Sequence, residues 1–486
     1  MTVRTVSSRL ETLVSAPPPH GKTYRLTAQR SPAETYASTE YPYARNYVTT
    51  AVLRARMKLL SRYEPVFENR TYSIKNMPSL KPHERCMIDE GTGALTPVVH
   101  VTRDDDYLLY SDIAVVFTEE ARVRARRRES ELTPLELWNA NREEVMKLAE
   151  KKAEVLNRPA DAYAVHETLF DITTGKVALN GRRFTAEVST FKPTNLVAIA
   201  RLFNSRRMLD FSAGWGDRLV GAIALDMELY VGVDPNGALF DGYADIVERF
   251  EEVDSVVSKS RRTTYTTATG RVRSFINSPF EKVSRQTLKA YGGFDLVFTS
   301  PPYFDLEVYS DESSQSTSNA AGGRMDALER WYSSFLMPSI EKAWSVLDEA
   351  GVMVLVINDP PYDVKFPNVH YVEQMISDVN RFVDSRYLGV IAYASVRGND
   401  VVNSQPMWMW RKVQANVLRS PANVAAERFV VVNTLKEAAA AKAQGARMVG
   451  FSSVEVGVMM SLGVKVIVGL SEKRKRRLAL LLTNSL

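Results

Sequence analysis

The chain has 486 residues, which exceeds the usual size of one domain and predicts two or three domains. Hydrophobic residues make up 45% and charged residues 24%, a globular composition that excludes wholesale disorder. The formal net charge of +5 is small for this length, so an anionic partner is permitted but not required.

The residue counts argue against metal and disulfide chemistry. Cys86 is the single cysteine, which excludes an intramolecular disulfide and a cysteine-bound zinc or iron–sulfur centre. The five histidines do not occur at metal-ligand spacing, so no metal site is expected. No run of about 18 apolar residues occurs, and the N-terminus lacks a secretory signal. We therefore expect a soluble, intracellular protein of the cytoplasm, the nucleus or, for a viral chain, the virion.

The first part of the chain predicts a tail followed by a mixed α+β extension. Residues 1–40 contain a triple proline at 17–19, which favours a flexible or extended tail over an organelle transit peptide, the alternative that the basic residues and serines there suggest. Residues 41–185 form the N-terminal extension, a possible substrate-binding region. A long helix is expected to begin there at Pro134, with Thr133 as its cap. The predicted elements are helices over 46–62 and 134–156 and strands over 97–101 and 107–117.

From residue 190 onward, apolar strands alternate with helices. This alternation predicts a mostly parallel, doubly wound, Rossmann-like α/β sheet over 186–415. A small α/β appendage is predicted over 422–486. Ligands of doubly wound sheets bind beyond the carboxyl ends of the strands. The predicted strands are 208–211, 229–234, 294–300, 352–358, 388–395 and 405–412, and a helix is predicted over 328–348.

The first candidate site is the strand-to-helix turn DFSAGWGDR at 210–218. Gly214 and Gly216 let the backbone turn sharply and approach a ligand closely. Asp234 ends the next strand, where a carboxylate can accept hydrogen bonds from two ribose hydroxyls. The glycine pattern is neither GxGxxG nor a Walker loop, which favours a nucleoside carrying an amino-acid tail. Asp210 can hold the ammonium group of that tail; strand-end capping is the alternative for both carboxylates.

The second candidate site directly follows the strand 294–300. Two prolines after a core strand form a rigid turn with exposed carbonyl groups. The Ser300 hydroxyl and the Pro301 carbonyl can accept the two N–H bonds of an exocyclic amine, which directs the nitrogen lone pair at an electrophile. Tyr303 offers a ring on which a flipped base stacks. The alternative is a proline-stiffened loop that only ends the strand.

Together these motifs resemble those of amino-methyltransferases that use S-adenosylmethionine. SPPY at 300–303 resembles the catalytic tetrapeptide, and DFSAGWGDR at 210–218 resembles the cofactor loop. VGVDPN at 231–236 resembles the ribose-binding turn, and FKPTNL at 191–196 resembles the segment over the methionine end of the cofactor. The resemblance covers about 190–412 and is strongest to DNA methyltransferases of phages and large DNA viruses.

The resemblance implies S-adenosylmethionine as cofactor and methyl transfer to cytosine N4 or adenine N6 in DNA. Methylation of RNA or protein, and an inactive fold used in assembly, remain alternatives. Asn277 falls where the family places an acidic contact to the adenine of the cofactor. The implied catalytic residues are Ser300, Pro301, Pro302 and Tyr303, and the implied cofactor-binding residues are Lys192, Pro193, Thr194, Asp210, Ser212, Gly214, Trp215, Gly216, Asp234, Pro235, Asn277 and Ser278.

Four further features have two interpretations each. The basic run over 122–128 either follows nucleic-acid phosphates, DNA more readily than RNA, or is a solvated surface. Glu307 either positions the substrate or is exposed to solvent. Trp215 either packs over the cofactor or anchors the core. Asp217 and Arg218 either pair with each other or cap the helix that begins there.

Overall fold

Residues 38–414 are described by the computed structural model apart from short gaps, as are 429–431 and 447–449. The gaps are 71, 73, 75–81, 91, 104–109, 111, 128–130, 305–306, 311–323, 360–370 and 398–399. The chain divides into two compact units, Met1–Lys412 and Val413–Leu486. The tail predicted over 1–40 lies almost entirely outside the described residues. Of the appendage predicted over 422–486, the structure describes the parallel pair β14 (Phe429–Val431) and β15 (Arg447–Val449).

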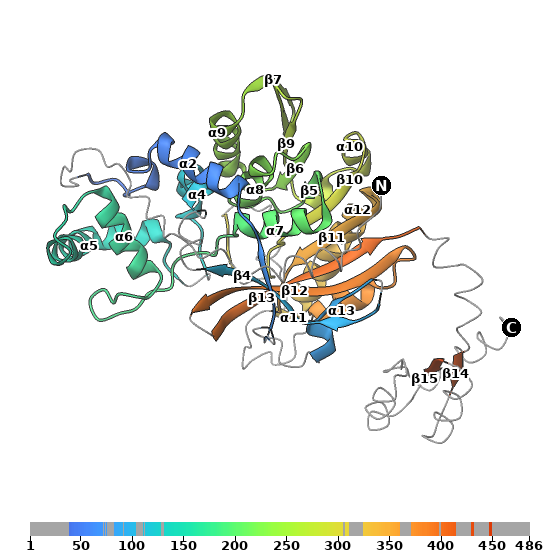
Figure 1. Cartoon of the computed structure of the whole chain (residues 1–486). Coiled ribbons are helices and arrows are strands. Elements are labelled where there is room, and N and C mark those ends of the chain that lie inside the picture. The colour runs from blue at the N-terminus through green and yellow to red at the C-terminus, as the bar shows by residue number, and fades with distance from the viewer. Residues whose placement is uncertain are drawn as a thin grey trace. The chain divides into compact units, whose positions relative to one another are not determined.

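The described strands of the first unit form one mixed sheet. In chain order they are β1 (Val66–Asn69), β2 (Met87–Ile88), β3 (Leu95–Thr96), β4 (Val98–Arg103), β5 (Arg207–Asp210), β6 (Leu229–Asp234), β7 (Val253–Lys259), β8 (Arg262–Thr267), β9 (Val272–Asn277), β10 (Phe294–Thr299), β11 (Leu347–Val356), β12 (Ser385–Arg397) and β13 (Asp400–Lys412). The main path is β1-β4-β12-β13-β11-β10-β5-β6-β9-β8-β7 (Figure 1). From β9 through β6, β5 and β10 to β11 every neighbouring pair is parallel. This strand order confirms the doubly wound, Rossmann-like α/β sheet.

The strand order reverses between β5 and β10. The chain runs outward from β5 to β6 and β9, and later adds β10 and β11 on the other side of β5. Leu209 of β5 lies beside Val297 of β10 in parallel register, so the carboxyl ends of both strands meet at one edge of the sheet. In open α/β sheets such a switch point is where ligands bind.

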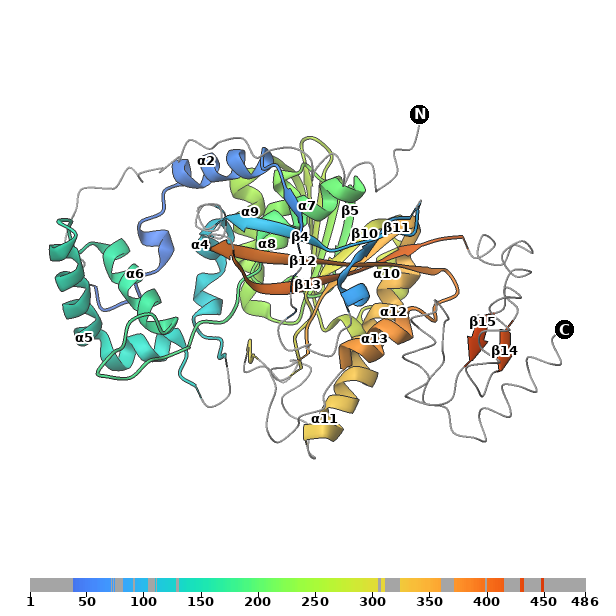
Figure 2. The same cartoon turned by 60° about the horizontal axis from the view of Figure 1, so that its bottom comes forward.

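Helices cover both faces of the sheet (Figure 2). Along β10, Leu296 and Phe298 pack in one core cluster and Val297 packs in the other, because successive strand residues point to opposite faces. The cluster that contains Leu296 and Phe298 includes residues of α2 (Thr50–Ser61), α4 (Asp112–Arg122), α7 (Pro193–Phe203), α8 (Asp217–Ala224) and α9 (Phe240–Phe250). The cluster that contains Val297 includes residues of α10 (Arg285–Lys289), α11 (Arg324–Trp331), α12 (Met337–Val346) and α13 (Tyr371–Val379).

No described helix has the length and apolar character needed to span a membrane.

The N-terminal extension adds strands to this sheet. Strand β4 pairs in parallel with β12, and β1 pairs antiparallel with β4. His100 of β4 is fully buried, with Nδ1 2.9 Å from Asn195 Oδ1 of α7 and Nε2 3.2 Å from the Tyr63 hydroxyl. Burial lowers the pKa of His100 to about 4, so the ring is neutral at physiological pH. These contacts connect the extension to the helix that precedes β5.

The strand predicted over 107–117 is wrong where the structure describes that segment. The chain forms helix α4 from Asp112 to Arg122 instead. Ile113, Ala114 and Thr118 are buried, a spacing of one and four residues that places them on one helical face. Since α4 contacts both α8 and α9, the burial of this face outweighs the strand propensity of its β-branched residues.

The long helix predicted over 134–156 is confirmed as α5 (Pro134–Val155). Its start is a capping box: the Glu136 N–H donates to Thr133 Oγ1 at 3.0 Å, and the Thr133 N–H donates to a Glu136 carboxylate oxygen at 2.8 Å. Thr133 is therefore the cap that the sequence predicts. Helix α5 packs with α6 (Ala162–Thr173) around an apolar cluster that includes Trp138.

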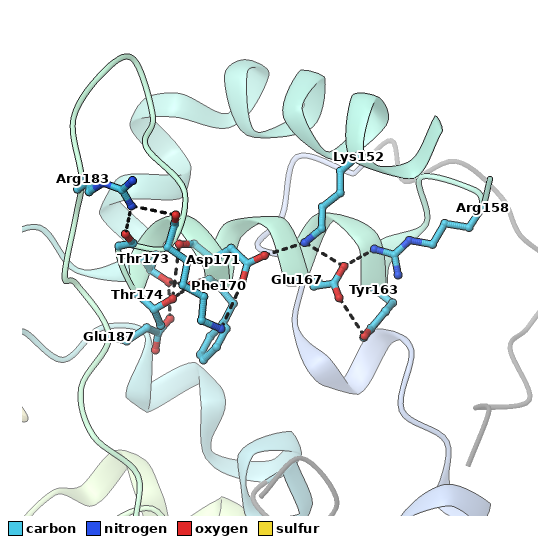
Figure 3. Close-up of polar contacts among 12 residues, drawn as sticks. Lys152, Arg158, Tyr163, Glu167, Phe170, Asp171, Thr173, Thr174, Arg183 and Glu187 are labelled. Atoms are coloured by element: carbon cyan, nitrogen blue, oxygen red, sulfur yellow. Dashed lines mark hydrogen bonds and ion pairs between the residues drawn. The ribbon is translucent and has the colours of Figure 1, made fainter. Parts of the chain in front are cut away.

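Ion pairs join α5 to α6 along the outer edge of this helical pair (Figure 3). Lys152 Nζ lies 2.7 Å from Asp171 Oδ2 and 3.2 Å from Glu167 Oε2. Arg158 pairs with the same Glu167 carboxylate. Every carboxylate in this group therefore has a cationic partner. Deeper in the same region, the Thr173 hydroxyl donates to Glu187 Oε1 at 2.9 Å.

Candidate functional site

The turn after β5 depends on two left-handed glycines. Gly214 has a φ of +60° and Gly216 a φ of +89°, a backbone region that residues with a side chain rarely adopt. Gly216 also caps α8, and a Cβ atom there would stand 3.0 Å from Ile246 Cδ1. The turn therefore requires glycine for its conformation and, at Gly216, for its packing as well.

Asp234 connects the end of β6 to this glycine turn. Its Oδ2 accepts a hydrogen bond from the Gly214 N–H at 2.8 Å, and its Oδ1 accepts one from the Asn236 N–H at 2.9 Å. The residue is 8% exposed, and burial raises its pKa to about 6 although both backbone bonds favour the ionised form. Each carboxylate oxygen can accept a second hydrogen bond, so Asp234 has capacity left for a ligand.

Asp210 forms an internal ion pair. It is fully buried, and its Oδ2 accepts hydrogen bonds from Arg218 Nε at 2.6 Å and from the Tyr230 hydroxyl at 3.0 Å. The Ser212 N–H approaches its Oδ1 at 3.4 Å. Arg218 thus pairs with Asp210, and the interpretation that pairs it with Asp217 is wrong. The Asp210 oxygens that the sequence analysis offers to an ammonium group are engaged inside the protein.

The serine–proline corner, residues 300–303, directly follows β10 and lies beside the glycine turn. The Ser300 hydroxyl donates to the Val356 carbonyl of β11 at 3.1 Å. Phe304 is a buried residue with a φ of +54°, and it packs edge-on against Trp331 at 5.9 Å between ring centroids. A left-handed phenylalanine is strained, and its burial against an aromatic ring holds that conformation. Burial raises the pKa of Tyr303 to about 12, so its phenol stays neutral.

The glycine turn and the serine–proline corner face one cavity. It lies beyond the carboxyl ends of β5, β6 and β10, at the switch point of the sheet. The two candidate motifs therefore share one cavity. The candidate residues that line it are Ser212, Gly214, Trp215, Asp234, Pro235, Ser300, Pro302 and Tyr303.

The other candidate residues do not line this cavity. Lys192 caps α7, and Pro193 and Thr194 are buried in its first turn. The cavity is lined instead by the residues just before them, among which Phe191 lies under the Arg218 guanidinium at 4.7 Å. The candidate residues outside the cavity lining are Lys192, Pro193, Thr194, Asp210, Gly216, Asn277, Ser278 and Pro301. Their functional roles remain predictions.

Glu307 is part of the cavity wall. It is 7% exposed, so the interpretation that it is exposed to solvent is wrong. Its Oε1 accepts hydrogen bonds from the Ser189 N–H at 2.9 Å and hydroxyl at 3.0 Å, and its Oε2 accepts one from the Tyr309 hydroxyl at 2.7 Å. Trp215 donates from Nε1 to the Ser189 carbonyl at 3.1 Å. Trp215 is therefore both a nearly buried anchor and a lining residue.

Two acidic lining residues are absent from the sequence-based set. Glu281, in the 3-10 helix Phe280–Lys282 after β9, has a buried Oε2 without a hydrogen-bond partner among the described residues. The family resemblance places an acidic contact to adenine at Asn277, the last residue of β9. The nearest acidic residue after that position is Glu281, which is the signal that could have identified it. The other is Asp217, the first residue of α8, which is 2% exposed.

The described arginines of the basic run over 122–128 include both buried and exposed side chains. Arg122 is 4% exposed and pairs with Glu187, and its Nη2 lies 3.6 Å from Glu119 Oε1. Arg124 and Arg126 each pair with a glutamate as well. The interpretation of a phosphate-binding face is therefore wrong for Arg122, acidic neighbours offset the charges of Arg124 and Arg126, and Arg127 is exposed.

The strand order and the cavity define this chain as an open, doubly wound α/β protein with a ligand cavity at its switch point. No protein-family model and no curated protein sequence matches it. Within the described residues, no group of three or more His, Cys, Asp and Glu side chains is placed to hold a metal ion.

Several solved structures are distantly similar to this chain. NSun6 from Pyrococcus horikoshii with SFG is 12% identical over 47% of this chain and 53% of its own, with a TM-score of 0.28. An rRNA methylase from Streptococcus thermophilus is 12% identical over 47% of this chain and 100% of its own, with a TM-score of 0.26. The O-methyltransferase TomG from Streptomyces achromogenes, in complex with SAM, is 15% identical over 56% of this chain and 90% of its own, with a TM-score of 0.28. These scores carry no argument about function, and the fold assignment rests on strand order and register.

Proposed function

We propose that this chain is an S-adenosylmethionine-dependent methyltransferase that methylates an exocyclic amino group of a nucleic-acid base, cytosine N4 or adenine N6 in DNA. One observation carries the proposal. Gly214 of the glycine turn, Asp234 and the corner residues Ser300, Pro302 and Tyr303 line a single cavity at the switch point of the sheet. The proposed nucleoside-binding half and the proposed amine-binding half thereby share one cavity, as direct group transfer requires.

The polar groups of the cavity fit the cofactor. Asp234 keeps acceptor capacity for the ribose hydroxyls, and the unpartnered Oε2 of Glu281 suits the amino group of adenine. Phe211 and Phe280 stack with ring centroids 5.0 Å apart and provide an apolar wall for the base. S-adenosylmethionine would supply a methyl group already activated by its sulfonium, so the protein has mainly to align the acceptor.

The residues of the corner suit that alignment. Because the Ser300 hydroxyl donates a hydrogen bond to the Val356 carbonyl, its oxygen can accept an N–H bond of the target amine. The second acceptor in this proposal is the Pro301 carbonyl, and the two bonds together would pyramidalise the nitrogen. The neutral ring of Tyr303 provides a stacking surface for a base turned out of its helix. No strong base is needed, since the methylated ammonium product is acidic and loses its proton to water.

Calorimetry with S-adenosylmethionine tests the cofactor assignment. The wild-type protein is expected to bind, and Asp234→Ala is expected to weaken binding by about 10-fold or more, because two ribose hydrogen bonds to a carboxylate are lost. Asp226→Ala is the matched control, since Asp226 is an exposed aspartate outside the cavity. Equal binding by the Asp234 and Asp226 variants, or none by the wild type, contradicts the assignment.

Transfer of a radioactive methyl group tests the substrate class. DNA, RNA and protein pools are offered in parallel, and labelled DNA is digested to nucleosides. Label is expected in N4-methylcytosine or N6-methyladenine, and Ser300→Ala is expected to lower the rate on the order of 100-fold, as for loss of a group that stabilises a transition state. Ser345→Ala, an exposed helical serine, is the control. Label found solely in RNA or protein rejects the DNA substrate.

A further inference from the structure

Two aspartates flank the glycine turn, and they are buried in opposite ways. The Asp210 Oδ2 accepts hydrogen bonds from the Arg218 guanidinium and the Tyr230 hydroxyl, and the Ser212 N–H approaches its Oδ1 at 3.4 Å, so both oxygens have partners within the protein. Asp217 is 2% exposed, yet neither of its carboxylate oxygens has a hydrogen-bond partner among the described residues. Asp217 lines the cavity, whereas Asp210 does not. A buried carboxylate without donors is costly, and such cost is typical of a group that awaits a ligand.

The cationic groups around Asp217 do not satisfy it. Arg218, Arg122 and Lys192 all face it and favour its ionised form, but desolvation dominates and raises the pKa of Asp217 to about 7. Arg218 is committed to Asp210, and Arg122 to Glu187. The Asp217 carboxylate therefore lacks N–H donors that a compact cation bound in the cavity would supply. A primary ammonium group supplies three such donors.

The position of Asp217 fits the tail of the ligand better than its base. Asp217 directly follows Gly216 at the start of α8, while Asp234 ends the next strand β6 and Glu281 lies in the 3-10 helix that follows β9. A nucleoside held by Asp234 and Glu281 therefore has its base directed toward β9, which leaves the α8 side of the turn to its 5′ substituent.

We propose that the Asp217 carboxylate binds the α-ammonium group of the amino-acid portion of S-adenosylmethionine. This assignment rests on the proposed function and gives the role first expected of Asp210 to a different residue. It has two consequences. Ligands that carry the amino-acid tail are preferred over tail-less nucleosides, and binding of the tail releases a proton near pH 6–7 because Asp217 must ionise.

Paired calorimetry with S-adenosylhomocysteine and 5′-methylthioadenosine, a thionucleoside without the amino-acid tail, tests the proposal. Asp217→Asn is expected to weaken S-adenosylhomocysteine binding by about 10- to 100-fold, the range for a charged hydrogen bond, and to change methylthioadenosine binding by less than about 3-fold. Asp226→Asn, the same change at an exposed aspartate, is expected to alter neither. Equal weakening of both ligands by Asp217→Asn, or no effect on S-adenosylhomocysteine, overturns the proposal.

A second measurement uses the wild-type protein alone. Titration at pH 6.5 in buffers of different ionisation enthalpy is expected to show more proton release with S-adenosylhomocysteine, which ionises both Asp217 and Asp234, than with methylthioadenosine, which ionises Asp234 alone. Equal proton release with both ligands overturns the assignment of Asp217 to the tail. If both ligands bind as expected of a nucleoside site but Asp217→Asn does not separate them, this inference fails alone. If the wild type binds neither ligand, the proposed function fails as well.

Discussion

Buried carboxylates have different surroundings in two regions of the molecule. One region is the cluster of Arg122, Glu187 and Thr173 beside the α5–α6 helical pair, called the anchor, and the other is the cavity. In the anchor, Glu187 pairs with Arg122 and also accepts a hydrogen bond from the Thr173 hydroxyl. In the cavity, Asp217 has no hydrogen-bond partner among the residues that the structure describes, and Asp234 keeps spare acceptor capacity. The contrast indicates that a carboxylate with a structural role has hydrogen-bond partners supplied by the protein. A carboxylate that binds a ligand has unfilled acceptor positions in the free protein, which lowers stability.

The two regions share one residue. Arg122 pairs with Glu187 in the anchor, and its positive charge also lowers the pKa of Asp217 in the cavity. Helix α4, which ends at Arg122, therefore connects the N-terminal extension electrostatically to the cavity wall. Substitutions in the anchor and in the cavity test whether the two kinds of carboxylate differ as the structure indicates.

The largest effect is expected from Arg122→Met. This change removes the cationic partner of Glu187 and leaves buried carboxylates uncompensated, so the free energy of unfolding is expected to fall by about 3–5 kcal/mol. Chemical denaturation measures the loss. Arg124→Met is the control, because the Arg124 side chain is 59% exposed and its replacement is expected to change stability by less than about 0.5 kcal/mol. A similar small loss for both variants refutes the view that Arg122 is an anchor.

A smaller effect of opposite sign is expected from Asp217→Asn. Burial raises the pKa of Asp217 from its ordinary value of 3.8 to about 7, so the folded wild type binds the proton more tightly than the unfolded chain. Wild-type stability therefore decreases as the pH rises from about 4 to about 7, and Asp217→Asn removes that decrease. Relative to wild type, the variant should gain on the order of 2–4 kcal/mol between these limits, since one pKa unit corresponds to about 1.4 kcal/mol.

Thermal unfolding without ligand, followed at several pH values, measures that gain. Asp226→Asn is the control: a hydrogen bond from Arg271 lowers the pKa of Asp226, so its stabilising contribution is present at neutral pH and lost as the pH falls. A stability difference between Asp217→Asn and wild type that does not vary with pH contradicts an unsatisfied carboxylate at this position.

Much of the fold follows from local sequence patterns. Strand β6 occupies the predicted residues 229–234, and α5 begins at Pro134 behind the predicted Thr133 cap, because periodicity and capping chemistry are local signals. Helix α4 was not predictable in this way. Its β-branched residues favour a strand, and only the packing of Ile113 and Ala114 against neighbouring helices makes it helical.

The candidate site shows the same limit. The glycine turn and the serine–proline corner are local motifs, and the sequence identifies both. The choice between two aspartates is not local, because Asp210 is saturated in part by Tyr230, a side chain supplied by the neighbouring strand. The sequence also places the acidic contact for adenine at Asn277, whereas the acidic residue on the cavity wall is Glu281. Side chains that converge from several elements decide both cases.

The smallest effect is expected at the exposed edge of the helical pair, from Lys152→Ala. Lys152 bridges Glu167 and Asp171, but its side chain is 30% exposed, and Arg158 still pairs with Glu167 after the change. The loss of stability is expected to stay below about 1 kcal/mol and to shrink at high salt, because solvent and ions screen the pair. Lys151→Ala, an exposed lysine at the adjacent position of the same helix, controls for helix propensity in parallel denaturation at low and high salt. A loss as large as that of Arg122→Met would mean that burial does not set the strength of these partnerships, and the contrast between anchor and cavity would then need another cause.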